Sequence, residues 1–381
     1  MVTRIVEVVN RKQRRQFVSL PRSIYDDDPA WVPPLTSTVG ATLDPRRGPF
    51  FEHGEAALFI ALDRNIPVGR ISAHINRSHN ELHEDDVGFF GFFECVQSQP
   101  VCDALFDHAE KWLTSKGMRY ARGPMSFTIN DEVGLLIRGF DYPPKIMMGH
   151  NPPYYQQLLE TRGYEKVKDL MAWDYVTNDV PELATRLASR VQEKEGLTIR
   201  QVEAGNIGRE IHVIMDVFNS AWSENWGFVP LSETEVRKTA ADLEMIIDPR
   251  IALVAEFEGE PVAIAIAFPD VNQLIMDLNG RLFPTGAFKL LRRIKQRQYT
   301  DARLVLLGIR KEWRKKLSGL SMALYVQMHS RCRSIGLRGG ELGWTLEDNH
   351  RINRGIELMG GIPYKTYRVY QKELPEEVVP A

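Results

Sequence analysis

The chain has 381 residues, which is long enough for two domains with substantial hydrophobic cores. It is 43% hydrophobic and 26% charged with a net charge of −2, a composition that indicates a soluble globular protein and argues against binding of nucleic acid. The three cysteines are too few for a disulfide framework, and we find neither a signal peptide nor an apolar run of membrane-spanning length. We therefore expect a cytoplasmic protein.

The first half of the chain is expected to alternate strands with helices. In chain order the predicted elements are a strand at 2–9, a helix at 10–25, strands at 57–62, 68–75 and 87–96, a helix at 100–116, a strand at 118–123, a helix at 152–162 and a strand at 164–176. A proline-rich loop is expected at 26–49 and a charged loop before the strand at 87–96. A long stretch with many glycines and prolines precedes the helix at 152–162.

The second half repeats this order. Its predicted elements are a strand at 197–202, helices at 206–221 and 232–246, strands at 251–257, 261–268 and 304–309, a helix at 318–335, a strand at 340–346, a helix at 349–359 and a strand at 364–372. Aligning Pro67 with Pro261 places the strand at 57–61 over 251–255. This internal similarity predicts an α/β (α+β) protein of two tandem domains, 1–195 and 196–381, each with a mixed, mostly antiparallel sheet flanked by helices.

A basic turn follows the strand at 304–309. Arg314-Lys-Lys-Leu-Ser-Gly319 opens the next helix, and such a turn directs unpaired backbone N–H groups and several cations to one point, which suits a pyrophosphate. The segment resembles the acyl-CoA-binding loop of the Gcn5-related N-acetyltransferase (GNAT) superfamily, Arg/Gln-x-x-Gly-x-Gly/Ala, with Leu317 at the place of the first glycine. The alternative is a solvated basic turn in an ordinary strand–helix unit.

The resemblance implies a coenzyme A thioester (acyl-CoA) as co-substrate and no metal. Backbone N–H groups near Gly308 would polarise the thioester carbonyl. The implied cofactor-binding residues are Leu307, Ile309, Arg314, Lys315, Lys316, Leu317, Ser318, Gly319, Leu320 and Asn349. Asn349 occupies a place where the superfamily often has an asparagine that faces coenzyme A, but asparagine is also a good helix N-cap.

The first half lacks a comparable turn. It has Glu94-Cys-Val-Gln-Ser-Gln-Pro100, without glycine and with little positive charge, so we expect domain 1–195 to lack the phosphate-binding loop and to bind the acceptor or act as a scaffold. The superfamily also often has a tyrosine general acid one turn before the glycine that ends the last helix. Leu159 and Ile356 occupy those two places here.

The stretch at 123–155 carries candidate polar residues between a strand and a helix. Asn130, Asp131, Glu132, His150, Asn151 and Tyr154 could bind an amine or relay its proton. Of these, we predict Glu132 and His150 as candidate general bases and Asn130 and Tyr154 as substrate contacts. The alternative is a turn-rich loop whose polar side chains satisfy its own backbone.

The segment at 218–230 predicts a wall for the acceptor and the acyl group. Its apolar candidates are Trp222, Trp226 and Phe228, and its polar candidates are Glu224 and Asn225. An aromatic plug between two helices is the alternative.

Two further segments each have two interpretations. His74, His79 and His83 lie near four carboxylates, but their spacing fits no standard ligand pattern and favours a solvated loop over a metal site. The insertion at 279–297 is basic and amphipathic, which suits peripheral contact with an anionic membrane at the inner face. A surface helix docked on its own domain is the alternative.

Five segments together resemble one bacterial family of tandem acetyltransferase-fold proteins, the bacterial ceramide synthase-like family. They are His53-Gly-Glu-Ala-Ala-Leu-Phe59, Gly88-Phe-Phe-Gly-Phe-Phe-Glu94, Ser126-Phe-Thr-Ile-Asn-Asp-Glu-Val-Gly134, Gly149-His-Asn-Pro-Pro-Tyr-Tyr155 and Asn225-Trp-Gly-Phe-Val-Pro230. The resemblance covers nearly the whole chain and implies an acyl-CoA-dependent N-acyltransferase that acylates a lipid amine, such as the sphingoid base 3-oxosphinganine. The alternatives are an acetyl-CoA-dependent N-acetyltransferase of a small amine and a non-enzymatic GNAT-fold binding protein.

Overall fold

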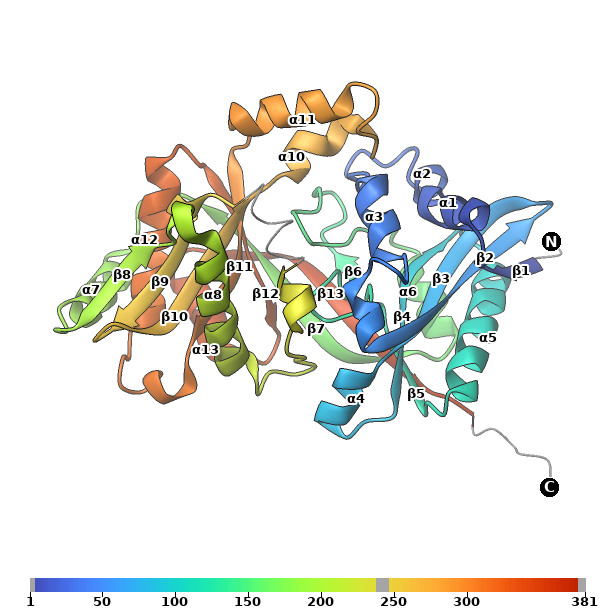
Figure 1. The fold of residues 1–381 in the computed structure, drawn as a ribbon, viewed down its shortest axis with the longest axis horizontal. Helices are drawn as coiled ribbons and strands as arrows, with labels where there is room; N and C mark the ends of the chain where they lie inside the picture. The colour runs from blue at the N-terminus through green and yellow to red at the C-terminus, as the bar shows by residue number, and fades with distance from the viewer. Residues whose placement is uncertain (1–3, 238–246, 376–381) are drawn as a thin grey trace. The chain divides into compact units, whose positions relative to one another are not determined.

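A computed structural model of the chain describes residues 4–237 and 247–375 (Figure 1). They form two compact units. Unit 1 comprises Met1–Leu170, Ile275–Ala287 and Lys365–Ala381, and unit 2 comprises Met171–Leu274 and Phe288–Tyr364. The predicted division at 195/196 follows the sequence repeat and stays a prediction. In the described part of the chain, no helix is both long and apolar enough to cross a bilayer.

The sheet of unit 1 is mostly antiparallel. Its strand order is β1 (Arg4–Glu7), β2 (Gly54–Asp63), β3 (Ile66–Asn76), β4 (Val87–Cys95), β5 (Tyr120–Gly123) and β13 (Ile362–Glu373, from Lys365 onwards), with β6 (Leu135–Arg138) paired to β13. β4 and β5 pair in parallel, whereas β3 with β4 and β5 with β13 pair antiparallel. The last strand of the chain therefore completes the sheet of the unit that begins the chain.

The helices of unit 1 cover this sheet with apolar side chains. They are α1 (Arg11–Ser19), α2 (Pro21–Ile24), α3 (Thr36–Thr42), η1 (Pro49–Glu52), α4 (Arg77–His83), α5 (Gln99–Ser115) and α6 (Tyr155–Thr161). α5 packs Leu105, Phe106 and Leu113 against the strands in one cluster. A second cluster holds Phe50 and Phe127, whose stacked rings lie 4.5 Å apart.

Unit 2 is built in the same way. Its strand order is β7 (Glu165–Val176, from Met171 onwards), β12 (Gly339–Leu346), β11 (Asp301–Ile309), β10 (Glu260–Pro269), β9 (Ala252–Phe257) and β8 (Leu197–Gln201). The helical segments along the second half of the chain are α7 (Glu182–Gln192), η2 (Ala204–Asn206), α8 (Ile207–Trp222), η3 (Pro249–Ile251), α10 (Asn272–Ile275), η4 (Met276–Leu278), α11 (Gly286–Lys295), η5 (Lys311–Trp313), α12 (Leu320–Ser334) and α13 (His350–Leu358).

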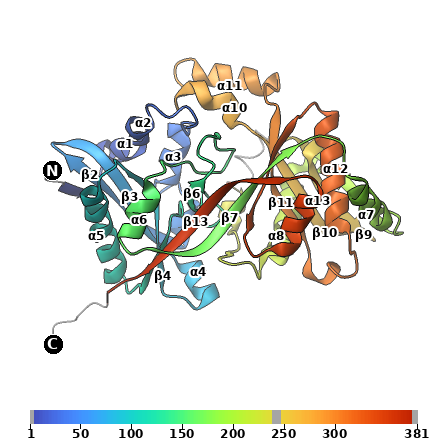
Figure 2. The ribbon, with the colours of Figure 1, turned by 180° about the vertical axis from the view of Figure 1, so that it is seen from behind.

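Two helices of unit 2, α8 and α12, pack on opposite faces of the sheet at β11. α8 contacts β11 through Trp222 and Ala221, which lie beside Gly308. α12 packs on the opposite face (Figures 1 and 2). Leu320 and Leu324 of this helix join Leu304 in the hydrophobic core. β11 is thus held between two helical layers.

The predicted fold class, a mixed and mostly antiparallel sheet flanked by helices, is confirmed. Three details were wrong. The proline-rich loop at 26–49 contains α3, and the charged loop before β4 contains α4, whose N-cap Asn76 accepts the backbone N–H of His79. The helix predicted at 10–25 is broken at Pro21, which begins α2 because proline has no N–H to donate inside a helix. The helix predicted at 232–246 lies partly outside the described residues.

Candidate functional site

The open end of β11 in unit 2 is the first feature of the candidate site. β11 pairs in parallel with β12 over 301–304, opposite 339–342. Among the described residues this pairing goes no further, although β11 continues to Ile309 and β12 to Leu346. β11 stays paired with β10 on its other side as far as Ile309. Residues 305–309 therefore present a strand edge that β12 does not cover.

The alternation of backbone groups along β11 decides which of them face this open edge. Arg310 donates its backbone N–H to the carbonyl of Val262, next to β10, at 2.9 Å. Successive residues of an antiparallel pair face opposite edges, so Gly308 also turns its N–H towards β10. By the same alternation Leu307 and Ile309 turn theirs towards the open edge. These are two of the residues that the sequence predicted as cofactor-binding, and that role stays a prediction.

The guanidinium of Arg314 closes the basic turn between β11 and α12. It donates from Nε to the carbonyl of Ile309 at 3.2 Å and from Nη2 to the carbonyl of Ala221 at 2.6 Å. Arg310 is also engaged, in an ion pair with Asp216. These two arginines shape the turn, so the lysines beyond them are the cations that face solvent.

The outer part of the turn presents a set of exposed donors. Lys315, Lys316 and Ser318 are exposed, and Gly319, with a φ of +97°, precedes the first residue of α12. The first backbone N–H groups of a helix have no partner within the helix, and this end of the helix dipole is positive. Such a set of donors fits the phosphates of coenzyme A.

Three other predicted cofactor residues have structural contacts of their own in unit 2. Leu317 and Leu320 are buried in the core, so the usual glycine of the loop is replaced here by a packing residue. Asn349 caps α13, because its side chain accepts the backbone N–H of Ile352 at 3.4 Å. The N-cap alternative for Asn349 is therefore present, and a contact with coenzyme A stays a prediction.

The hydrogen-bond register identifies the equivalent strand edge in unit 1. Just after β4, Val96 donates its backbone N–H to the carbonyl of Val68 at 3.0 Å, which is the same bond that ends the pairing of β10 with β11 in unit 2. The residue before this donor faces the outer edge of the strand. Cys95 is therefore the counterpart of Ile309.

Two tyrosine hydroxyls occupy this edge in unit 1. The hydroxyl of Tyr155 accepts the backbone N–H of Cys95 at 2.7 Å, and the hydroxyl of Tyr154 donates to the carbonyl of Cys95 at 2.7 Å. The corresponding start of α13 in unit 2, residues 349–353, contains no tyrosine. The backbone groups at this position are thus engaged by tyrosines in unit 1 and not in unit 2.

The two candidate bases differ in exposure: Glu132 lies between β5 and β6, and His150 lies between β6 and α6. The side chain of Glu132 keeps exposed surface, yet protein surrounds it closely, and this loss of bulk water raises its pKa while Arg70 opposes the rise. His150 has a buried side chain with Nε2 2.8 Å from Oδ2 of Asp28, and burial lowers its pKa while Asp28 opposes. Glu132 is thus an exposed residue, whereas the side chain of His150 is buried.

Several hydrogen bonds join residues within the stretch 123–155 to one another. The hydroxyl of Thr128 donates to Asp131 at 2.8 Å and accepts the backbone N–H of Asn130 at 3.1 Å. The side chain of Asn151 bonds both backbone groups of Leu136, at 2.7 and 3.0 Å. These bonds agree with the alternative interpretation for Asp131 and Asn151, and the substrate roles of Asn130 and Tyr154 stay predictions.

The predicted aromatic wall combines buried and exposed rings. Phe218 lies 4.9 Å from Trp222 and 5.6 Å from Phe228 between ring centroids. Phe228 is buried, whereas Trp222 and Trp226 keep part of their surface exposed. Phe228 therefore fits the interpretation as a plug, and the two tryptophans can still contact a substrate.

The two polar candidates next to this wall lie in the turn after α8. Asn225 donates its backbone N–H to the carbonyl of Trp222 at 2.8 Å. The carboxylate of Glu224 lies 3.0 Å from Nζ of Lys311, and its side chain is 69% exposed. An exposed pair of this kind adds little stability, so Glu224 stays available to a ligand.

Sequence reasoning missed a buried polar cluster around Glu94 in unit 1. Glu94 accepts hydrogen bonds from Tyr25 at 2.8 Å, from Tyr155 at 2.9 Å and from Arg70 at 3.4 Å. Burial raises the pKa of Glu94, while the charge of Arg70 opposes the rise. The partners are 24 to 69 residues away along the chain, so no local pattern reveals the cluster. It holds Tyr155 in place beside Cys95.

The histidines near the first hairpin have other partners. His74 is buried between aromatic rings, and Nε2 of His79 lies 3.4 Å from the carboxylate of Asp85. In the residues described, 4–237 and 247–375, no group of three or more histidine, cysteine, aspartate or glutamate side chains is arranged to hold a metal ion.

Comparison with known proteins identifies relatives of nearly full length. The sequence is 37% identical over 374 residues to a protein named bacterial ceramide synthase from Caulobacter vibrioides, with 97% of each chain covered. It is 36% identical over 371 residues to protein YghO of Escherichia coli. The matched region covers 96% of this chain and 94% of YghO. No protein-family model matches the sequence.

Solved structures show the same fold at low sequence identity. A tandem GNAT protein from the clavulanic acid biosynthesis pathway has a TM-score of 0.59 at 12% identity and covers 100% of this chain and 99% of its own. A GCN5-related N-acetyltransferase from Sphaerobacter thermophilus has a TM-score of 0.53 at 14% identity, with 97% of this chain and 96% of its own covered. The chain therefore has the tandem GNAT fold.

Proposed function

This chain belongs to the family of the bacterial ceramide synthase and is an N-acyltransferase, and we propose that it transfers a fatty acyl group from acyl-CoA to a sphingoid base such as 3-oxosphinganine. The observation that carries the proposal is the difference between the two strand edges. The open edge of β11 in unit 2 is followed by exposed cations and N–H groups that could bind phosphate. The corresponding strand edge in unit 1, at Cys95, is occupied by the hydroxyls of Tyr154 and Tyr155.

The acyl-CoA is assigned to unit 2. Lys315, Lys316 and N–H groups of the first turn of α12 after that of Leu320, which donates to the carbonyl of Leu317, would hold its phosphates. Both backbone groups of Leu307 and the N–H of Ile309, whose carbonyl accepts from Arg314, would pair with the amide-containing arm that leads to the thioester, as an added strand would pair with a sheet edge. Gly308 lets Trp222 lie close to the strand at the level of the thioester.

The acceptor reacts as a neutral amine. Its nitrogen forms a bond to the thioester carbonyl carbon, the carbon–sulfur bond breaks, and coenzyme A leaves as a thiolate. The sequence predicts Glu132 or His150 as the group that takes the proton from nitrogen, and of the two Glu132 is the exposed residue. Backbone N–H groups of β11 would stabilise the oxyanion. The amide product and free coenzyme A account for all atoms of the two substrates.

Ligand-induced stabilisation tests this function. We expect palmitoyl-CoA, used below its micelle-forming concentration, to raise Tm more than acetyl-CoA or free coenzyme A. A ligand at a hundred times its Kd adds about 2.7 kcal/mol to the free energy of unfolding. The double variant Lys315→Gln/Lys316→Gln should weaken the response to all three, whereas Lys111→Gln, at an exposed site in unit 1, should not.

The outcome separates the alternatives. An equal response to all three ligands would favour a donor with a short acyl group and a small amine as acceptor. The absence of any response would contradict an acyl-CoA-dependent enzyme and favour a binding protein with the GNAT fold.

We further propose that residues 279–297 bring the enzyme to an anionic membrane from the cytoplasm. On α11, Phe288 is 71% exposed and Leu291 is 57% exposed. The helix ends with Arg292, Arg293 and Lys295, and residues 279–297 contain no acidic side chain. Exposed apolar side chains beside cations are typical of helices that lie in the membrane interface.

Vesicle binding tests the membrane contact. The double variant Phe288→Ser/Leu291→Ser should bind vesicles of phosphatidylglycerol about tenfold or more weakly than the wild type, because it loses the buried apolar area. Leu82→Ser, which alters an equally exposed leucine on α4, is the matched control. Equal binding of the wild type and the double variant would refute the contact.

A further inference from the structure

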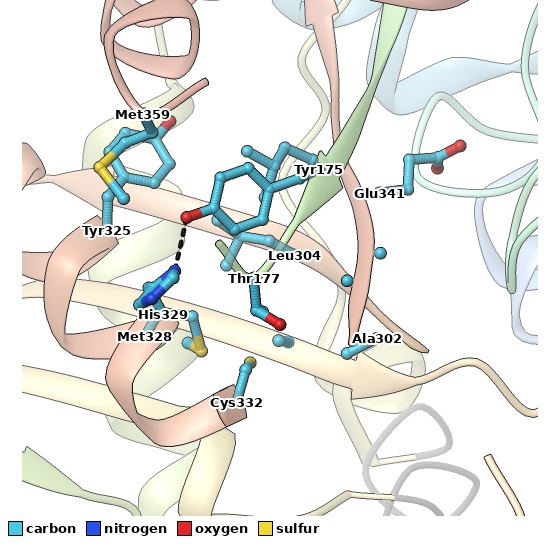
Figure 3. A pocket seen from close by; sticks show the side chains of 14 residues that line it. Tyr175, Thr177, Ala302, Leu304, Tyr325, Met328, His329, Cys332, Glu341 and Met359 are labelled. Carbon is cyan, nitrogen blue, oxygen red and sulfur yellow. Dashed lines mark hydrogen bonds between the residues drawn. The ribbon is translucent and has the colours of Figure 1, made fainter. Parts of the chain in front are cut away.

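A pocket in unit 2 lies where β11 and β12 are paired, at residues 301–304 and 339–342 (Figure 3). Its walls come from β7, β11, β12 and α12, and from Met359 just after α13. Leu304 and Leu342 line it, and they are also the last residues of β11 and β12 that pair with each other. The pocket therefore begins where the open edge of β11 ends.

Four of the polar side chains that line this pocket have hydrogen-bond partners within the protein: Tyr175, Thr177, His329 and Glu341. The hydroxyl of Tyr175 is hydrogen-bonded to Nδ1 of His329 at 2.6 Å (Figure 3), and the hydroxyl of Thr177 donates to the carbonyl of Arg338 at 2.9 Å. The carboxylate of Glu341 accepts from Arg303 at 2.8 Å. A ligand would meet few free donors or acceptors in the pocket, so the lining suits hydrocarbon.

Besides Tyr325 and His329, α12 contributes apolar side chains to the pocket. Met328 and Cys332 lie on one face of α12, and Met359 approaches from the end of α13 (Figure 3). Burial raises the pKa of the Cys332 thiol to about 12, so the thiol stays protonated, and burial lowers the pKa of His329. Methionine side chains adapt to irregular apolar ligands because they are unbranched and flexible.

We propose that this pocket receives the distal methylene groups of the acyl chain and that Met328 and Cys332 determine the chain length the enzyme accepts. The inference rests on the proposed acyl-CoA site of the same unit. With the thioester at the open edge of β11, an acyl chain that continues past Leu304 enters the pocket directly. The acyl chain, rather than the acceptor, is the occupant because the pocket continues from the edge assigned to acyl-CoA.

The dependence of kcat/KM on acyl length tests the proposal. Acetyl-, octanoyl- and palmitoyl-CoA are compared with one sphingoid acceptor. Cys332→Phe, which fills the pocket, should lower kcat/KM for palmitoyl-CoA relative to acetyl-CoA by about tenfold or more, because each excluded methylene changes binding by about tenfold. Met328→Ala, which enlarges the pocket, should shift the preference towards longer chains. Met322→Ala, a buried methionine on α12 that does not line the pocket, is the matched control.

The outcomes distinguish this inference from the proposed function. If the wild type binds no coenzyme A thioester, the proposed function and the pocket assignment both fail. If palmitoyl-CoA binds and reacts but Cys332→Phe and Met328→Ala leave the chain-length preference as it is in Met322→Ala, only the pocket assignment is overturned. A change that affects the length of the acceptor chain instead of the acyl chain would also overturn it.

Discussion

Replacing Gly308 by alanine should lower kcat by about 100-fold, while the Kd of palmitoyl-CoA changes by less than about threefold. A Cβ atom at Gly308 would lie 2.1 Å from the ring of Trp222 and 3.0 Å from Cβ of Ala221. Either the ring or β11 must move, and a displacement of about 1 Å at a reacting centre costs about that factor in rate. The substitution leaves unchanged the lysines and N–H groups that are proposed to bind the phosphates, so binding should be nearly unaffected. Steady-state kinetics and equilibrium binding measure the two effects.

A substitution on α8 provides the control. Gly208→Ala adds the same methyl group where no atom lies within 4 Å, so it should leave kcat unchanged. The double variant Gly308→Ala/Trp222→Leu removes the close contact with the ring and should have a higher Tm than Gly308→Ala. An unchanged kcat in Gly308→Ala would refute the assignment of the thioester to this part of β11.

Replacing Glu132 by glutamine should lower kcat by about 100-fold to 10,000-fold without weakening the binding of acyl-CoA, because the amine loses its proton acceptor. The pKa of Glu132 is raised above the usual value of 4.5 by desolvation. A general base works when it is deprotonated, so the wild-type rate should fall as the pH drops through this raised pKa. The pH profile of kcat/KM should lose that acidic limb in Glu132→Gln.

Two other substitutions separate chemistry from structure. Glu52→Gln changes an exposed carboxylate of the same unit and should leave the profile unchanged. His150→Gln breaks the contact with Asp28, so it should lower Tm but change kcat little. If His150→Gln abolished turnover at unchanged stability while Glu132→Gln remained active, the roles of the two residues would have to be exchanged.

The order of strands and helices could be read from the sequence because apolar periodicity and glycine stops are local signals. The pairing partners could not. β13 of the second repeat pairs with β5 of the first, with Tyr370 opposite Gly123, and nothing in either segment specifies this partner. The short helix α3 was missed because it has no side-chain cap, and its stability depends on contacts of Val39 and Leu43 with a distant cluster.

The candidate site shows the same division. The cations of the basic turn are clustered in sequence, so the turn itself could be found, but the use of Arg314 to close it depends on the carbonyl of Ala221, 93 residues away. The engagement of Cys95 by Tyr154 and Tyr155 follows only from the hydrogen-bond register. The acyl pocket likewise depends on contacts that are remote in the sequence.

The most direct test of the account is a mass-spectrometric acyl-transfer assay. The enzyme is incubated with isotopically labelled palmitoyl-CoA and 3-oxosphinganine in phosphatidylglycerol vesicles, and both the labelled amide and free coenzyme A are quantified. The account predicts that the two products form in equal amounts and that both are lost in Glu132→Gln. Release of coenzyme A without amide, or amide formation only from acetyl-CoA and a small amine, would contradict it.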